Sequence, residues 1–310
     1  MRRLNVLVWH VHGSYTTALV QGRHRYLIPT LPRRGPWGGG RAETYEWPDN
    51  VVEVTPGQCA HEPVDVVILQ RTPELEGLAE AWTGGRRPGI DIPALYLEHN
   101  APQGRVNDMR HPAADRPRLQ VVHVTHFNRL FWDTGSTPTR VIEHGIPDPG
   151  HRYTGELARG AAAINEPGRR ARVVGADLLP AFETVAPVDV YGIGTENNLP
   201  QWRLHEDMTR RRVYLHTYRW TSLGLALLEA MHLGMPVVAL ATTEVPAAVP
   251  PEAGIVSSRL DELLDGYRSL ISDPEEARRR GEAARLHALR RYGLARFLRD
   301  WDKAFEDAVA

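Results

Sequence analysis

The sequence predicts an α/β protein built from two doubly wound parallel sheets. Short apolar runs rich in β-branched residues recur along the chain, and helical patterns lie between several of them. Apolar strands that alternate with helices are typical of parallel sheets covered on both faces. A chain of 310 residues is long enough for two such domains. The expected strands are 4–9, 64–69, 94–97, 121–124, 161–164, 188–191, 213–215 and 237–240.

The boundary between the two domains is expected at residues 145–150, which contain two prolines and two glycines. We therefore expect a first domain at 1–147 and a second at 148–293. The remaining segment, 294–310, carries an apolar stripe at helical spacing, and such a stripe needs a surface that covers it. We expect this helix to pack back onto the first domain. The stripe consists of Phe297, Leu298, Trp301 and Phe305.

The composition excludes several classes of chemistry. A formal net charge of −1 gives no basic field, so no nucleic-acid partner is expected. Cys59 is the single cysteine, which excludes an intrachain disulfide and a cysteine-based metal site. Lys303 is the single lysine and lies far along the chain, which argues against pyridoxal phosphate enzymes and the Walker phosphate loop. A bound phosphate would therefore need arginines and backbone amides.

Targeting and membrane signals are not expected in this sequence. The apolar stretch 4–9 is short for the core of a signal peptide, and no run of apolar residues reaches membrane-spanning length. We expect a cytoplasmic protein without a transmembrane segment. Peripheral association with the inner membrane stays open as an alternative.

The most informative stretch is 213–249, which shows the order strand, loop, helix and strand. Gly224 opens the helix and Gly234 closes it. The loop before Gly224 would present backbone N–H groups at a helix N-terminus, at the edge where open α/β sheets bind anionic ligands. Glu229 in the same helix would face a diol of that ligand. The alternative is an ordinary connecting helix with a solvated glutamate.

The segment GLALLEAMHLGMPVVA resembles the G-L-x-x-x-E-A-M-A-x-G-x-P-V-V-A signature of glycosyltransferase family 4. TRVIEHGIPDP is similar to the end of the family's first domain, and DPEEARRRGEAARLHALRRY to its penultimate helix. The resemblance implies GT-B architecture, in which two Rossmann-like domains face each other across a cleft and a C-terminal helix crosses back to the first. It also implies transfer of a sugar, with retention of configuration, from a UDP- or GDP-sugar to an unknown acceptor hydroxyl, without a metal or other cofactor.

The family signature contains two glutamates. The second corresponds to Glu229, which the resemblance assigns to the ribose hydroxyls of the donor. The first would fall at Thr221, or at Trp220 if the loop carries an extra residue, so this carboxylate is missing. The Thr221 hydroxyl is then the candidate catalytic group beside the sugar. The residues whose backbone would bind the donor are Ser222, Leu223 and Gly224.

The family binds the donor diphosphate with an arginine and a lysine at the start of the second domain. Here Arg169, Arg170 and Arg172 cluster between an expected strand and the following helix. Forked guanidinium hydrogen bonds suit a diphosphate, and Arg169 and Arg172 are the chosen donor-binding residues. An exposed basic turn is the alternative. Gly192 and Gly194 follow the next strand and would let the nucleotide approach the backbone, unless they are simple turn glycines.

The first domain contributes two further candidates. Gly13 follows the first strand and would allow close approach of the donor phosphates. His99 follows the strand 94–97, and the resemblance places it near the donor sugar as a candidate catalytic residue. A structural histidine is the alternative for this position. Because the fourteen histidines contain no H-E-x-x-H motif, no metal site is expected.

A long loop, 29–48, is rich in glycine, proline and aromatic residues. Trp37 and Trp47, with three arginines nearby, would form a platform on which an acceptor sugar stacks. A mobile loop without a specific role is the alternative.

Two other functions remain open at this stage. A sugar-nucleotide epimerase of similar fold would need acids and bases for its chemistry, and Thr221 in place of a carboxylate favours the transferase. A non-catalytic protein that binds nucleotide-sugars after losing the first signature glutamate is the other.

Overall fold

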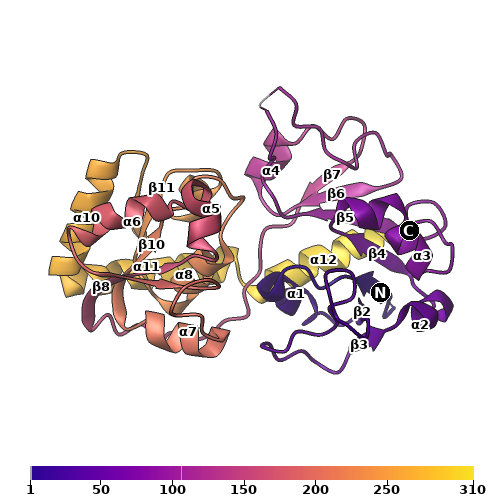
Figure 1. Cartoon of the computed structure of the whole chain (residues 1–310), viewed down its shortest axis with the longest axis horizontal. Coiled ribbons are helices and arrows are strands. Elements are labelled where there is room, and N and C mark those ends of the chain that lie inside the picture. The colour runs from indigo at the N-terminus through magenta and orange to yellow at the C-terminus, as the bar shows by residue number, and fades with distance from the viewer. Residues whose placement is uncertain (1, 106) are drawn as a thin grey trace. The chain divides into compact units, whose positions relative to one another are not determined.

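The computed structural model describes residues 2–105 and 107–310. Contacts divide the chain into two compact units: unit 1 comprises Met1–Gly145 with Leu294–Ala310, and unit 2 comprises Ile146–Gly293. The sequence placed this boundary at 147/148 and treated 294–310 as a separate segment. Each unit is built around one parallel sheet, which confirms the predicted fold class (Figure 1).

The sheet of unit 1 has the strand order β3-β2-β1-β4-β5-β6-β7, with all neighbours parallel. Its strands are β1 (Asn5–Val8), β2 (Arg25–Pro29), β3 (Val51–Val54), β4 (Val66–Leu69), β5 (Ala94–Glu98), β6 (Gln120–His123) and β7 (Thr139–Val141). The predicted apolar runs correspond to β1, β4, β5 and β6. The sequence did not predict β2, β3 and β7.

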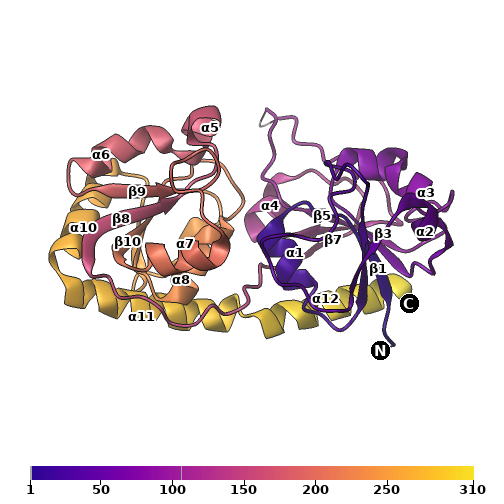
Figure 2. The same ribbon diagram turned by 60° about the horizontal axis from the view of Figure 1, so that its bottom comes forward.

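Helices cover both faces of this sheet. They are α1 (Gly13–Leu19), α2 (Pro56–His61), the π-helical turn η1 (Glu74–Leu78), α3 (Ala79–Trp82), α4 (His126–Phe131) and α12 (Leu294–Val309). The C-terminal helix α12 packs against α1 and β4 (Figures 1 and 2). Phe297 and Phe305 are fully buried there, and the indole N–H of Trp301 donates to the hydroxyl of Tyr15 at 3.2 Å. The last helix therefore completes the core of unit 1.

The sheet of unit 2 has the order β12-β11-β10-β8-β9, again with parallel neighbours. Its strands are β8 (Leu157–Ala163), β9 (Val188–Tyr191), β10 (Arg211–His216), β11 (Val237–Leu240) and β12 (Gly254–Ser257). Its helices are α5 (Pro167–Val174), the 3₁₀ turn η2 (Ala176–Leu178), α6 (Leu179–Glu183), α7 (Gln201–Met208), α8 (Leu225–Leu233), α9 (Val245–Ala248), α10 (Leu260–Ser272) and α11 (Pro274–Arg291).

The two faces of the unit 2 sheet are packed by different helices. Side chains of α8 and α11 form one core with Tyr214 of β10, whereas side chains of α6 and α10 form the other core with Val213 and Leu215. This division follows from the alternation of side chains along a strand. Helix α8 is apolar on nearly all sides because it lies between the sheet and α11.

Both sheets contain a point at which the order of the strands reverses. In unit 1 this switch point lies between β1 and β4, and in unit 2 it lies between β8 and β10. Open α/β sheets bind their ligands outside the carboxyl ends of the strands at such a point. Gly13 follows β1, the predicted arginines follow β8, and residues 217–224 follow β10. The topology therefore brings most predicted site residues to a switch point of their own unit.

Candidate functional site

In unit 2, the end of helix α5, which follows β8, is joined directly by hydrogen bonds to the loop that leaves β10. The backbone N–H of Arg219 donates to the carbonyl of Val173 at 2.9 Å, and the hydroxyl of Thr217 donates to the carbonyl of Val174 at 2.8 Å. Gly175 packs so closely on Thr217 that a side chain would not fit there. The end of α5 and the loop after β10 are thus fixed to each other at the switch point.

The G-x-G after β9 belongs to the same edge of the sheet. Gly192 has a φ of +126°, and a Cβ there would lie 2.6 Å from Asn165 Oδ1. That amide oxygen accepts a hydrogen bond of 2.9 Å from the backbone of Ile193. Gly194 also has a positive φ, of +79°. The backbone conformation thus requires glycine at Gly192 and favours it at Gly194.

The predicted phosphate-binding arginines lie in the helix α5 and not in a loop before it. The sequence argument placed these arginines between a strand and the following helix, but the helix already begins at Pro167, whose missing N–H costs nothing there. The side chains of Arg169 and Arg172 are 70% and 76% exposed. Arg169 pairs with Glu166, and Arg172 lies 3.0 Å from Asp177. Both arginines are therefore accessible to an anion, and each already has a carboxylate partner.

Two further arginines lie at this edge: Arg219, which was not predicted as a cation of the site, and Arg170, which the sequence placed in the arginine cluster without choosing it as a donor-binding residue. Arg219 pairs with Asp177 through both of its terminal nitrogens, and its hydrogen bond lowers the pKa of that carboxyl group below its ordinary value. Arg170 lies over the ring of Tyr218 at 5.7 Å. Four arginines, Arg169, Arg170, Arg172 and Arg219, thus accompany two carboxylates. This excess of positive charge suits a polyanionic ligand.

The helix α8 begins next to these arginines. Gly224 is its N-cap residue, with extended backbone and no side chain to satisfy the first N–H groups. Its Cα packs against the ring of His216, where a Cβ would approach Cε1 to 2.6 Å. Ser222 and Leu223 are buried, and Thr221 is half-buried. The side chains of Ser222 and Leu223 are thus not exposed, whereas Thr221 stays partly accessible.

Glu229 lies in the second turn of α8 and is only 6% exposed. The sequence predicted this residue but not its partners. The amide of Gln201 donates to Oε1 at 3.0 Å, and His205 Nε2 lies 3.1 Å from Oε2. Both partners come from α7. The carboxylate is therefore held in one orientation by an amide and an imidazole rather than by an arginine.

In unit 1, the candidates lie at the switch point between β1 and β4. Gly13 is the first residue of α1, and a Cβ there would meet the ring of Tyr45 at 2.8 Å. His99 Nε2 lies 3.0 Å from the Oε1 atom of Gln70, and its ring centroid is 4.2 Å from that of His12. Burial lowers the pKa of His12 to about 4 and that of His99 well below its ordinary value. Both imidazoles are thus neutral near pH 7.

The loop 29–48 is bonded to this edge of the sheet. Trp47 is buried, and its N–H donates to Thr17 Oγ1 at 2.7 Å, so it is not available as a stacking platform. Trp37 is half-buried and stacks on Arg71, whose guanidinium carbon lies 4.3 Å from the ring centroid. The prediction that Trp37 and Trp47 together form a platform for an acceptor sugar is therefore wrong for Trp47.

Two features of the structure bear on metals and membranes. Over residues 2–105 and 107–310, no three side chains of His, Cys, Asp or Glu come together in a way that would hold a metal ion. Over the same ranges, none of the helices combines the length and the apolarity that crossing a membrane requires.

Solved structures of other proteins share the fold of this chain. Sucrose-phosphate synthase from Thermosynechococcus elongatus superposes with a TM-score of 0.68 at 12% identity, over 98% of this chain and 99% of that chain. HepE from Anabaena, in complex with UDP, gives 0.70 at 13% identity over 98% and 100%. A glycosyltransferase from Rickettsia africae ESF-5 gives 0.65 at 11% identity over 100% and 99%. The chain therefore has the GT-B fold of glycosyltransferases.

One segment of the sequence also matches a family model. Residues 197–287 match the family described as glycosyl transferases group 1. This segment lies in unit 2 and includes α7, α8 and Glu229. Among curated protein sequences, none matches the chain significantly.

Proposed function

We propose that this protein transfers a sugar from a nucleotide-sugar to an acceptor hydroxyl. The observation that carries the proposal is the edge of unit 2 at the switch point between β8 and β10. The segments that follow these two strands carry four arginines, the N-terminus of α8 and the buried carboxylate of Glu229. The family of residues 197–287 and the fold both support glycosyl transfer.

The donor in this proposal is a UDP-sugar, with a GDP-sugar as the second choice. HepE, which shares the fold, has been solved with UDP and with UDP-glucose. On this chain, Glu229 would accept hydrogen bonds from the ribose hydroxyls. Arg169, Arg172 and the amides at the start of α8 would bind the diphosphate. These donors would also stabilise the negative charge that develops on the diphosphate as it leaves.

The transfer in this proposal retains the anomeric configuration and uses no metal. The bond between the sugar C1 and the β-phosphate oxygen breaks, and the acceptor oxygen forms a new bond to C1 on the same face. The acceptor proton passes to an oxygen of the leaving β-phosphate. Thr221 would contribute a hydroxyl beside the sugar, whereas Gly13 and His99 of unit 1 stay candidates from the sequence.

A first experiment measures nucleotide binding by calorimetry with UDP and GDP. We expect Glu229→Ala to weaken binding by about 1–3 kcal/mol, because hydrogen bonds to a charged group are lost. Replacing Arg169 and Arg172 together by alanine should weaken UDP far more than uridine. The matched control is the double replacement of Arg278 and Arg279, which are exposed and paired with glutamates on α11. Unchanged UDP affinity in the Glu229 variant would contradict the site assignment.

A second experiment separates catalysis from binding. The missing carboxylate at Thr221 favours, as a second candidate, a protein that binds nucleotide-sugars without turning them over. Release of UDP from UDP-sugars is measured with a panel of acceptors and with water alone. Acceptor-dependent release supports the transferase. Tight binding without release supports the binding protein, and formation of an isomeric UDP-sugar supports the epimerase.

A further inference from the structure

The partners of Glu229 are presented by a regular spacing on α7. Gln201 and His205 are four residues apart, so both side chains lie on the same face of that helix. Each of them bonds a different oxygen of the Glu229 carboxylate, at 3.0 Å and 3.1 Å. His205 is buried like Glu229 itself. Side chains of one helix, α7, thus bond both oxygens of the Glu229 carboxylate.

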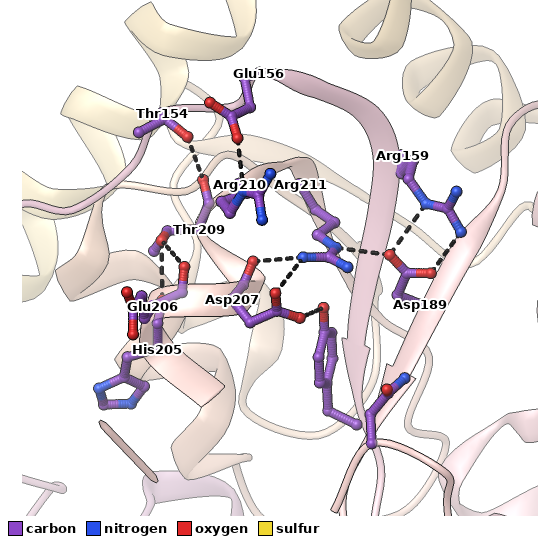
Figure 3. A network of polar contacts seen from close by, with 12 residues as sticks. Thr154, Glu156, Arg159, Asp189, His205, Glu206, Asp207, Thr209, Arg210 and Arg211 are labelled. Carbon is purple, nitrogen blue, oxygen red and sulfur yellow. Dashed lines mark hydrogen bonds and ion pairs between the residues drawn. The ribbon is translucent and has the colours of Figure 1, made fainter. Parts of the chain in front are cut away.

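The other side of α7 is anchored to the sheet by a network of charged and polar groups. Asp207 accepts a hydrogen bond of 2.8 Å from Tyr191 and pairs with Arg211 at 2.9 Å. Arg211 also bonds Asp189 at 2.6 Å, and Asp189 pairs in turn with Arg159. Figure 3 shows the ring of His205 turned away from this network. The network therefore fixes α7 on the sheet and leaves His205 for Glu229.

An ionised carboxylate has about four lone-pair positions, two on each oxygen. Gln201 occupies one position on Oε1 and His205 occupies one on Oε2. One acceptor position then remains on each oxygen. Two acceptors on adjacent oxygens match the two neighbouring hydroxyls of a ribose, whereas a 2′-deoxyribose offers only one hydroxyl there.

We infer that Gln201 and His205 are positioning residues that orient Glu229 toward both ribose hydroxyls and so select ribonucleotide donors over 2′-deoxyribonucleotide donors. The inference rests on the proposed function, because it requires a nucleotide at this edge of unit 2. The two residues act through Glu229 and do not contact the reacting bond. Their loss is therefore expected to change the recognition of the sugar hydroxyls and not the chemistry at the anomeric carbon.

The test compares the affinities of UDP and 2′-deoxy-UDP, measured by calorimetry for the full chain, and of GDP and 2′-deoxy-GDP in parallel. We expect the wild-type protein to prefer the ribonucleotide by about tenfold, the value of one hydrogen bond to a charged group. Gln201→Leu and His205→Phe should each bring this ratio close to one, mainly by weakening the ribonucleotide. His205→Gln keeps a side-chain donor and should restore part of the preference. Glu206→Gln changes an exposed neighbour on α7 and is the matched control.

Three outcomes decide the matter. A ratio that falls in the Gln201 and His205 variants but not in the Glu206 control supports the inference. A wild-type ratio that persists in folded Gln201→Leu, or tighter UDP binding in that variant, overturns it, because Gln201 and His205 would then be structural or would compete with the ligand. Gln201 is half-buried, so this variant stays informative if His205→Phe does not fold. Failure of the wild-type protein to bind any of the four nucleotides overturns the proposed function itself.

Discussion

Replacing His144 by phenylalanine should make unit 1 markedly less sensitive to acid. His144 is 3% exposed, and neither of its ring nitrogens has a hydrogen-bond partner among the described residues. Burial lowers its pKa to about 3, against about 6.5 in an unfolded chain. Between these two values the unfolded chain binds a proton that the folded chain does not. Folding stability therefore rises with pH up to about 6.5 and is lost as the pH falls toward 3.

The size of the effect follows from the same two pKa values. At pH 5, which is about 1.5 units below the pKa of about 6.5 in the unfolded chain, protonation of the unfolded histidine lowers the folding stability by about 2 kcal/mol. Phenylalanine removes this term and, since His144 makes no hydrogen bond, should change the stability at pH 7.5 by no more than about 1 kcal/mol. Other titrating groups contribute equally to both proteins and cancel in the comparison.

The assay is urea denaturation at pH 7.5 and pH 5.0, followed by tryptophan fluorescence. Of the eight tryptophans, only Trp202 and Trp220 lie in unit 2, so the signal reports mainly on unit 1. His126→Phe makes the same chemical change at an exposed position and should lose as much stability in acid as the wild-type protein. If His144→Phe also loses as much as the wild-type protein, the imidazole is hydrated or paired in solution and the reasoning is refuted.

Three further substitutions test other parts of the structure. Gly192→Ala forces a Cβ into a left-handed backbone beside Asn165 and should lower stability by about 2 kcal/mol in thermal denaturation, whereas Gly168→Ala, in open space, should not lower it. Trp47→Phe removes a hydrogen bond to Thr17 and should cost about 1 kcal/mol in urea denaturation; equal stability would show that the bond contributes nothing. Asp177→Asn frees two arginines from the carboxylate that pairs with them, so UDP binding should become tighter in calorimetry, with a steeper salt dependence. Weaker binding would show that Asp177 and UDP do not compete for these arginines.

The sequence was most informative where burial dictates composition. Strands β1, β4, β5 and β6 are covered on both faces, so they are continuous apolar runs that periodicity detects. Strands β3 and β7 lie at the edges of the unit 1 sheet and contain partly exposed residues, so their patterns are weak. Strand β2 was missed although it lies inside the sheet and four of its five residues are buried. The start of helix α5 was placed after the arginines and not at Pro167, because Pro167 and Gly168 are also typical of a loop.

In the candidate site, too, local patterns in the sequence identified some residues but not their partners. Glu229 was found from its family motif, and Gly192 from a short local pattern. The partners Gln201 and His205 lie more than twenty residues before Glu229, and only the packing of α7 on α8 brings them to it. Arg219 meets Asp177 by an equally non-local route. Such pairs depend on tertiary contacts that neither periodicity nor a motif encodes.

The position of α12 has a consequence for how the chain is made. Most of unit 1 leaves the ribosome before unit 2, yet the core of unit 1 includes Phe297, Trp301 and Phe305, which leave after unit 2. Unit 2 is continuous and has all its residues before unit 1 has received its final helix. During synthesis, the apolar surface around Tyr15 therefore stays uncovered until α12 has been made. In that period nascent unit 1 is prone to aggregate and to bind chaperones. Removal of the last seventeen residues would leave the protein permanently in that unfinished state.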